Sequence, residues 1–300
     1  MLELIRGYAA AAFDGAQREG RLGEVSTGLL ELARLLVASE PLRTALADGS
    51  IPASDRRAVL EDLLSGKIAE EALAPVTFAA ETERASELGK TVERLVEVAE
   101  MAVANAAGGE PLGAEPPSGR TGSYDRIGGY AERVFEKVSK PGVVDEIEDE
   151  LFRLARIAEQ SPALRDAMGD GEVPVARRLA VLDDLLKGQV RTETLWLAGY
   201  VIRAGRSRDL PGALDRLVAL AAADRGRRVA EIRSAVPLDD GERERLSEAL
   251  TRIVRRPVEL RVLIDPLVIG GVSVAVGNII IDGTVRHRLD QLRESLLLGV

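Results

Sequence analysis

The chain has 300 residues, a net charge of −9 and a hydrophobic share of 46%, which predicts two or three packed domains rather than a disordered chain. Its lack of cysteine and its single histidine exclude disulfides, iron–sulfur clusters, thiolate zinc sites and two-histidine metal sites. With aromatic residues at 3% and an acidic balance, the chain lacks the stacking surfaces and the positive charge that nucleic acid binders use. The composition therefore favours a helical interaction protein over an enzyme.

The N-terminal residues predict a helix rather than a targeting signal. Residues 1–20 carry Glu3 and no small-residue cleavage site after an apolar stretch, so they are typical of an amphipathic helix. The most apolar stretch, residues 262–281, is interrupted by Asp265, Pro266 and three glycines and is rich in β-branched residues, which favours strands. We therefore expect no membrane insertion by this chain.

A long internal repeat organises most of the chain. Residues 8–99 align without a gap with residues 130–221 at an offset of 122, and about thirty of some ninety aligned positions are identical. A period of this length indicates duplicated domains rather than a short solenoid unit. The identities include Tyr8 with Tyr130, Phe13 with Phe135, Asp48-Gly49 with Asp170-Gly171, Pro52 with Pro174, and the strings VLEDLLSG from Val59 and VLDDLLKG from Val181.

Each copy predicts a bundle of about six short helices. Turn residues separate the helical stretches, and Ser54 is expected to cap the helix that follows it. In the first copy, apolar residues recur at three- and four-residue spacing, as on a buried helix face, in five stretches. These stretches are 3–16, 24–38, 54–65, 70–86 and 91–105.

The pattern changes to a small α+β module near the C-terminus. Alternating residues predict strands at 229–236 and 258–265, with a helix at 241–254 between them. The string GVSVAVGNIIIDG predicts two further strands around Gly277-Asn278, and a last amphipathic helix is expected over about 284–298.

These patterns predict a mainly α chain in which two tandem six-helix bundles precede the strand-containing module. The first helical bundle spans 1–105 and the second 123–225, and the C-terminal module spans 226–300. The Gly/Pro-rich stretch 106–122 between the bundles is expected to be a linker.

We find no residue pattern that would form an active site. The chain contains neither G-x-x-x-x-G-K-[ST] nor G-x-G-x-x-G, so the glycines at 270, 271 and 277 are expected to serve turns. His287 is expected at the surface, with a pH sensor at an interface as the alternative. No nucleophile, base and oxyanion hole come together, and we expect no catalytic, cofactor-binding or metal-binding residue.

The C-terminal segment resembles the closing segment of the delta subunit of F-type ATP synthases, the family that includes the mitochondrial oligomycin-sensitivity-conferring protein. The family pattern is Asp-Pro, a Gly-Gly step, alternating valines, a glycine, and Ile-Asp-Gly before a Leu-rich helix. Residues 123–300 have the length of an ordinary delta subunit, and the extra N-terminal copy is similar to the long delta chains of actinobacteria. The matching motif residues include Asp265, Pro266, Gly270, Gly271, Gly277, Asp282 and Gly283.

The resemblance implies a non-catalytic stator subunit in the peripheral stalk of an ATP synthase. Such a subunit links the catalytic head to a b-type stalk, so that proton-driven rotation is coupled to ATP synthesis, without a cofactor or a nucleic acid partner. The implied partners are the N-terminal helices of alpha subunits and a separate b-type stalk chain, on the cytoplasmic side of the bacterial plasma membrane. A free-standing helical adaptor with other partners is the alternative.

The resemblance places the alpha-subunit helix in a groove between the first and fifth helices of the second bundle. A helix laid in an apolar groove is held by side chains at i, i+3, i+4 and i+7. The groove candidates are Tyr130, Val134, Leu195, Leu197 and Val201, and plain bundle core is the alternative for the same residues. The first copy would grip a second alpha helix, pack along the stalk, or stiffen the second copy; we expect head or stalk contact.

Overall fold

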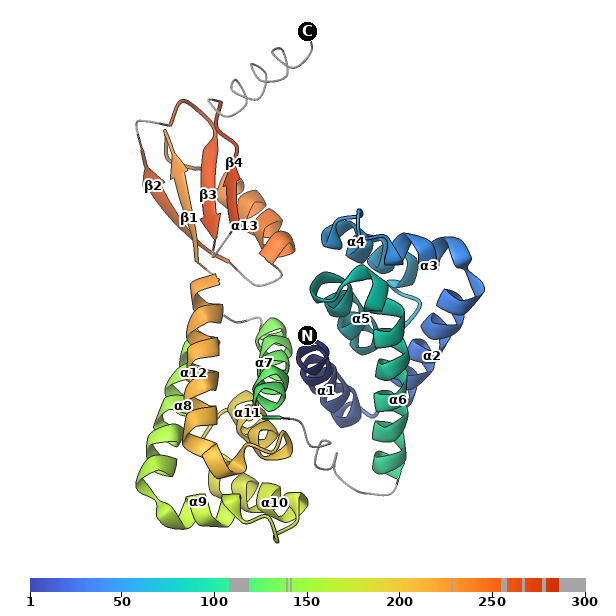
Figure 1. Ribbon diagram of the computed structural model, residues 1–300. Helices are drawn as coiled ribbons and strands as arrows, with labels where there is room; N and C mark the ends of the chain where they lie inside the picture. Colours follow the sequence, from blue (N-terminus) through green and yellow to red (C-terminus); the bar gives the residue numbers. More distant parts are fainter. Residues whose placement is uncertain are drawn as a thin grey trace. The chain divides into compact units, whose positions relative to one another are not determined.

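The computed structural model describes residues 1–107, 119–138, 140, 142–227, 229–254, 258–265, 268–276 and 279–285 (Figure 1). It divides into two compact units. Unit 1 contains Met1–Val134 and Asp149–Val218, and unit 2 contains Phe135–Glu148 and the chain from Ala219 onward. Unit 1 therefore holds the first copy and most of the second, while unit 2 holds the C-terminal sheet.

The first copy consists of six α-helices and one short 3-10 helix. One apolar stripe of α1, formed by Ile5, Ala9 and Phe13, belongs to the core that α2, α4, α5 and α6 complete. The elements are α1 (Leu2–Arg18), α2 (Leu22–Ala38), α3 (Glu40–Ala47), α4 (Ala53–Leu64), α5 (Glu70–Thr82), η1 (Ala85–Glu87) and α6 (Leu88–Ala107).

The structure corrects three details of the expected helices. The helix α3 lies in a stretch that the apolar spacing left unassigned, and it begins because the Ser39 hydroxyl accepts a hydrogen bond from the backbone N–H of Leu42 at 3.4 Å. Ser54 is not a cap, because α4 already begins at Ala53 and Pro52 is its N-cap residue. The expected helix at 70–86 ends at Thr82, before η1.

The second copy repeats this order of elements. Helices α9 and α10 and the 3-10 helix η2 begin and end 122 residues after α3, α4 and η1, and Ser161 caps α9 as Ser39 caps α3. The predicted class of two six-helix copies before a strand-containing module is confirmed. The elements of the second copy are α7 (Arg120–Lys137), α8 (Val143–Gln160), α9 (Pro162–Gly169), α10 (Val175–Leu186), α11 (Thr192–Arg203), η2 (Ser207–Asp209) and α12 (Leu210–Arg227).

The sheet of unit 2 has four strands in the order β2-β1-β3-β4. Strand β1 pairs parallel with β2 and antiparallel with β3, and β3 pairs antiparallel with β4. One face packs on α13 through a core that includes Ile232, Leu250 and Val274, and Figure 1 shows the helix on this side. The elements are β1 (Val229–Ser234), α13 (Asp240–Val254), β2 (Glu259–Ile264), β3 (Val272–Val276) and β4 (Ile279–Asp282).

The four strands and α13 lie where the sequence predicted them, except that β1 ends at Ser234 rather than at residue 236. Gly277 and Asn278, between β3 and β4, lie outside the described residues, as do His287 and nearly all of the helix expected at 284–298. The described part of the chain contains no helix long and apolar enough to cross a membrane.

Candidate functional site

Four of the five predicted groove residues are buried in unit 1. Tyr130, Val134, Leu197 and Val201 are 2%, 7%, 1% and 0% exposed. The repeat places Val134 opposite Ala12 and Val201 opposite Ala79, and both alanines belong to the core of the first copy. The bundle-core alternative therefore fits Val134 and Val201, while the assignment of all five residues to a helix-binding face stays a prediction.

Tyr130 belongs to a ring pair that occurs once in each copy. Its ring stacks on Tyr200 of α11 with centroids 3.9 Å apart and an interplanar angle of 13°. In the first copy, Tyr8 stacks on Phe78 of α5 with centroids 4.1 Å apart and an angle of 5°. The stack thus joins the first and fifth helices in both copies, which are the helices expected to form the groove.

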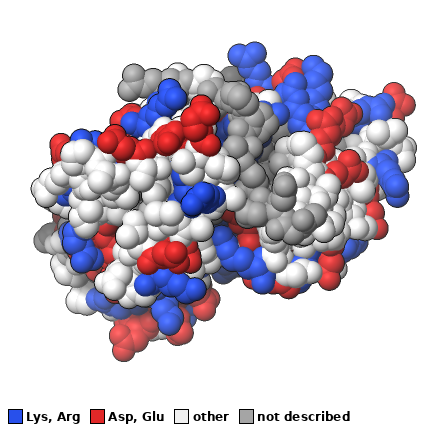
Figure 2. Space-filling model, turned by 90° about the horizontal axis from the view of Figure 1, so that it is seen from below, with Lys and Arg blue, Asp and Glu red and all other residues white. Residues whose placement is uncertain are grey.

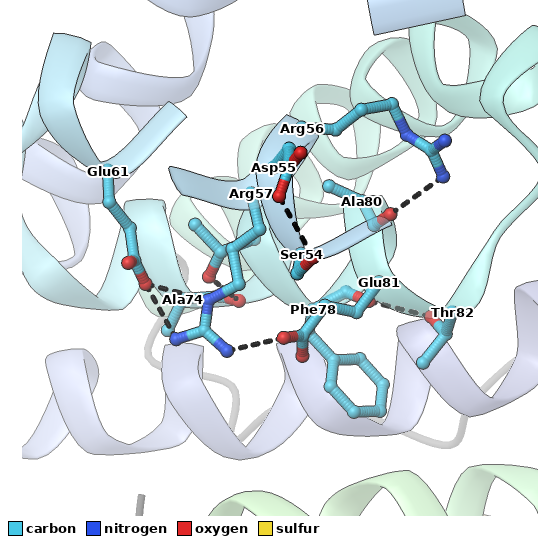
Figure 3. A network of polar contacts seen from close by, with 11 residues as sticks. Ser54, Asp55, Arg56, Arg57, Glu61, Ala74, Phe78, Ala80, Glu81 and Thr82 are labelled. Atoms are coloured by element: carbon cyan, nitrogen blue, oxygen red, sulfur yellow. Dashed lines mark hydrogen bonds and ion pairs between the residues drawn. The ribbon is translucent and has the colours of Figure 1, made fainter. Parts of the chain in front are cut away.

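A polar network between α4 and α5 holds the fifth helix of the first copy in place (Figure 3). The Arg57 guanidinium binds Glu61 on its own helix at 2.6 Å and also binds Glu81 on α5. Arg56 is buried and donates to a backbone carbonyl of α5 at 3.2 Å. Because both arginines reach from α4 to α5, they fix the helix that carries the Phe78 ring.

The outer face of α1 contacts the first and fifth helices of the second copy through charged groups. The Asp14 carboxylate accepts hydrogen bonds from the Tyr130 hydroxyl at 2.8 Å and from the Arg203 guanidinium at 2.6 Å. Arg18 lies 3.9 Å from the same carboxylate oxygen and 3.7 Å from the ring centroid of Trp196. The predicted groove residue Tyr130 therefore contacts the first copy, 116 residues away in the sequence.

Burial sets the electrostatics of this cluster. The pKa of the Tyr130 hydroxyl is raised well above its ordinary value, because burial and then the nearby Asp14 charge both disfavour the phenolate. For Arg203, burial is the largest single influence and opposes the charged form, but the attraction of Asp14, the hydrogen bond to it and the nearby Tyr130 and Tyr200 together outweigh burial and raise the pKa of the guanidinium. At neutral pH, Tyr130 is thus a hydroxyl donor and Arg203 a cation.

A groove of about 400 Å³ lies beside this cluster. Its apolar walls come from α10 and α11, the fourth and fifth helices of the second copy, rather than from the first and fifth helices expected from the sequence. It includes the predicted groove residue Leu195, which is half-buried. Asp14 and Arg18 of α1 line the same groove. The principal second-copy residues around it are Leu179, Leu182, Asp183, Leu195, Trp196, Tyr200 and Arg203.

Two equivalent glycines allow α1 and α7 to approach closely. A Cβ atom on Gly7 would lie 1.9 Å from the carbonyl oxygen of Arg126, and one on Gly129 would lie 1.8 Å from that of Leu4. Gly7 and Gly129 are 122 residues apart, as are Leu4 and Arg126. The contact is therefore reciprocal, and Figure 1 shows the two helices side by side.

The sequence carried one signal of this contact that helical periodicity alone missed. All residues from Gly7 to Asp14 are buried, whereas a helix at the surface of one bundle buries a single stripe. The string GYAAAAF at 7–13 is apolar or small all around the helix, which is typical of a helix covered on more than one side. The roles of Asp14, Arg18 and Arg203 have no counterpart in the predicted site.

The motif residues of the C-terminal module build the turns at one end of the sheet. Gly270 and Gly271 have φ of +68° and +77°, a conformation that other residues adopt at a cost. A Cβ atom on Gly271 would also lie 2.4 Å from the carbonyl oxygen of Gly283. Asp282 accepts a hydrogen bond from the backbone N–H of Thr284 at 2.9 Å, which completes the turn after β4.

Asp265 begins the connection between β2 and β3, which ends at Gly270 and Gly271. Its backbone N–H donates to the carbonyl of Ser234 at 2.9 Å, and its own carbonyl accepts from the N–H of Val268 at 3.1 Å. Pro266 and Gly277, the remaining motif residues, lie outside the described residues. The described motif residues thus shape the backbone path between β2 and β3 and after β4.

The sheet face opposite α13 leaves apolar side chains in solvent. Ile280 of β4 is 76% exposed, and Ala275, its partner on β3, is exposed as well. Leu263 on β2 is 41% exposed. This set of side chains, called the open sheet face below, lies on β2, β3 and β4, with Glu231 and Arg233 of β1 on the same face. It is one of several exposed apolar sites of unit 2 that could contact a partner.

Charged side chains of both signs are interspersed on the face of the molecule in Figure 2. In the described part of the chain, no group of three or more His, Asp or Glu residues could hold a metal ion. The described residues do form surfaces that a partner could contact. Among these surfaces are the groove beside Asp14 in unit 1 and the open sheet face in unit 2.

Comparison with known proteins identifies a family match over nearly the whole chain. The family model described as ATP synthase delta (OSCP) subunit matches residues 4–105 and again 128–296. A protein of Salinispora arenicola named ATP synthase subunit delta is 35% identical over 89% of this chain and 86% of its own length. The protein of the same name from Kineococcus radiotolerans is 32% identical over 98% of both chains.

Among the solved structures that match is a chain of the Toxoplasma gondii mitochondrial ATP synthase hexamer. It is 16% identical, with a TM-score of 0.26 over 57% of this chain and 96% of that chain. A TM-score this low carries no argument about the fold.

Proposed function

We propose that this chain, which belongs to the ATP synthase delta (OSCP) subunit family, is a structural subunit of the peripheral stalk of an F-type ATP synthase. The observation that carries this proposal is the family match over both copies and the C-terminal module. The subunit interacts with other subunits of the complex and associates with the membrane peripherally, through them. It connects the catalytic head to the stalk, so that the head does not turn with the rotor.

The head contact lies on the second copy. The alpha subunit contributes an amphipathic N-terminal helix, and apolar side chains of that helix enter the groove between α10 and α11 next to Leu195. Of the five sequence-predicted residues, Tyr130 and Leu195 line this groove, while Val134, Leu197 and Val201 are buried and do not line it. The half-buried indole of Trp196 adds a large apolar surface at the same place.

The stalk contact lies on unit 2. A b-type stalk helix packs on the open sheet face, where Ile280 and Leu263 bury apolar surface on binding. The motif turns hold β3 and β4 in position for this contact. The complex sits on the cytoplasmic side of the bacterial plasma membrane, as the bacterial relatives support.

The experiment is affinity purification of the tagged intact chain from detergent-solubilised membranes of its own organism. We expect alpha and b-type chains of the ATP synthase to co-purify. A chain that purifies alone, or with unrelated proteins, would contradict the proposal and favour the free-standing adaptor.

Two surface variants of the intact chain separate the two contacts. Leu195→Ser is expected to weaken retention of the head, and Ile280→Lys to weaken retention of the b-type chain. Each variant is the control for the other, because the two residues belong to different compact units. Loss of both partners in both variants would show general misfolding instead, and helicity measured by circular dichroism identifies that case.

A further inference from the structure

The groove of the second copy has one wall that the second copy does not supply. Asp14 and Arg18 of α1 line it together with residues of α10 and α11. We propose that α1 of the first copy completes the groove and that Asp14 provides a hydrogen-bond acceptor to the docked helix. The proposal rests on the proposed function, because its occupant is the alpha-subunit helix, and it assigns the first copy a part in that site.

The Asp14 carboxylate is only half satisfied. Its Oδ2 atom accepts from both Tyr130 and Arg203, while its Oδ1 atom is buried and has no hydrogen-bond partner among the described residues. Asp14 is 5% exposed, so bulk water does little to compensate for the missing bond. A buried acceptor without a partner is costly, so a donor brought by the docked helix would stabilise Asp14.

The charges around the groove determine which donor fits. Asp14 and Asp183 are balanced by Arg18 and Arg203, so the lining carries two charges of each sign. A cationic donor would add a positive charge that this lining does not require, whereas a hydroxyl or amide donor satisfies Oδ1 without one. The occupant is therefore an amphipathic helix with apolar side chains toward Leu195 and a neutral Ser, Thr, Asn or Gln toward Asp14.

The position of this wall depends on the close approach of α1 and α7. Gly7 and Gly129 leave no room for a Cβ atom against the opposite backbone. A methyl group at Gly7 pushes α1 away from α7. It thereby moves Asp14, which lies two helical turns farther along α1, away from Tyr130. Gly15 on the same helix has no atom within 4 Å of the position its Cβ would take, so Gly15→Ala is a matched control.

The test is a fluorescence titration of the intact chain with a synthetic peptide of the N-terminal helix of the cognate alpha subunit. Trp196, the single tryptophan of the chain, lines the groove and reports occupancy directly. We expect Asp14→Asn to raise the Kd about fivefold, the size of one lost hydrogen bond, and Arg18→Gln, which removes a charged side chain from the lining, to raise it as well. Glu19→Gln, one residue past the end of α1 and exposed, is expected to bind like the wild type.

Gly7→Ala tests the same wall without changing a groove side chain. We expect it to raise the Kd about tenfold or more, while Gly15→Ala leaves the Kd unchanged. A tighter complex with Gly7→Ala would overturn the proposal, because it would show that α1 obstructs the groove rather than completes it. Should Asp14→Asn lose its helicity, Arg18→Gln decides, since the Arg18 side chain is 39% exposed and its removal leaves the fold intact.

The failure of this inference is distinguishable from that of the proposed function. If Leu195→Ser weakens the peptide while Asp14→Asn, Arg18→Gln and Gly7→Ala do not, the groove belongs to the second copy alone; the inference is then wrong and the proposed head contact stands. If the wild-type chain does not bind the peptide, the head contact itself is wrong, and the inference fails with it.

Discussion

The hydroxyl of Tyr130 donates to the carboxylate of Asp14 at 2.8 Å and thereby joins α7 of the second copy to α1 of the first. Arg203 binds the same oxygen at 2.6 Å. All three side chains are at least nine-tenths buried. Within unit 1, the duplication therefore did more than place two similar bundles in one chain, because a buried polar cluster now connects them.

Removing Asp14 is expected to destabilise unit 1 strongly. Asp14→Ala leaves the buried Arg203 without its counter-charge, which costs about 3–5 kcal/mol, whereas Tyr130→Phe loses one hydrogen bond and costs about 1 kcal/mol. Urea unfolding followed by circular dichroism measures both values. Glu19→Ala is the control, because its partner Arg21 is partly exposed, and we expect a change within about 0.5 kcal/mol. Equal effects of Asp14→Ala and Glu19→Ala would contradict the buried pair.

The stability of unit 1 is expected to fall at alkaline pH because of Tyr130. In the unfolded chain a tyrosine loses its proton near pH 10, while the raised pKa of Tyr130 keeps the hydroxyl protonated in the folded state. The contribution of the Tyr130 hydroxyl to the free energy of unfolding is therefore complete below about pH 10. As pH rises beyond that value the contribution is lost, by about 1.4 kcal/mol per pH unit.

The comparison of wild type with Tyr130→Phe isolates this effect. The other three tyrosines contribute equally to both proteins, so only the difference in unfolding free energy between pH 9 and pH 11 is informative. We expect the wild type to lose its advantage over the variant above about pH 10. A difference that does not change with pH would mean that Tyr130 is not enclosed with Asp14 as the structure has it.

Gly271→Ala is expected to open the sheet of unit 2. The residue has φ of +77°, and a Cβ atom would meet the Gly283 carbonyl oxygen at 2.4 Å, so strain and a clash together cost at least about 1–3 kcal/mol. Hydrogen exchange of the β1 and β3 amides is the readout. Gly241→Ala on α13, whose Cβ would have its nearest contact at 3.4 Å, is expected to leave that exchange unchanged. Equal protection in both variants would disprove this role for Gly271.

Arg56 and Arg178 are expected to have matching effects in the two copies. Arg56 donates to the carbonyl oxygens of Ile51 and Ala80 at 2.7 and 3.2 Å, and Arg178 donates to the carbonyl of Met168 at 2.8 Å. Arg56→Met and Arg178→Met retain most of the volume but leave buried acceptors unsatisfied, which costs about 1–3 kcal/mol in each case.

Urea unfolding checks this pair of variants against Arg94→Met. Arg94 is exposed on α6, and its replacement is expected to change the free energy of unfolding by less than about 0.5 kcal/mol. If only one of the two variants lowered the free energy of unfolding, the prediction would be wrong. The two arginines would then have different roles in the two copies, although they occupy equivalent positions.

The sequence by itself determined the local elements of this protein and the equivalence of its two copies. The 122-residue offset, the apolar spacing of the helices and the alternation of β1 and β2 depend on the residue order alone, because side-chain periods of 3.6 and 2 follow from backbone geometry. The Gly-Gly step at 270–271 was likewise readable as a turn, since positive φ favours glycine. The short helix α3 was not predicted, because its eight residues contain too few helical turns for a repeating apolar spacing to be recognised.

Only the tertiary structure decided which residues meet across the repeat. Periodicity states that a residue lies on a buried face, but it does not say what covers that face, so Tyr130 and Val134 looked alike in the sequence. In the structure Tyr130 contacts Asp14 of the first copy, while Val134 corresponds to the core residue Ala12. The pairing of Gly7 with the Arg126 carbonyl and of Gly129 with the Leu4 carbonyl depends on how two helices cross, and a crossing is a property of two surfaces together.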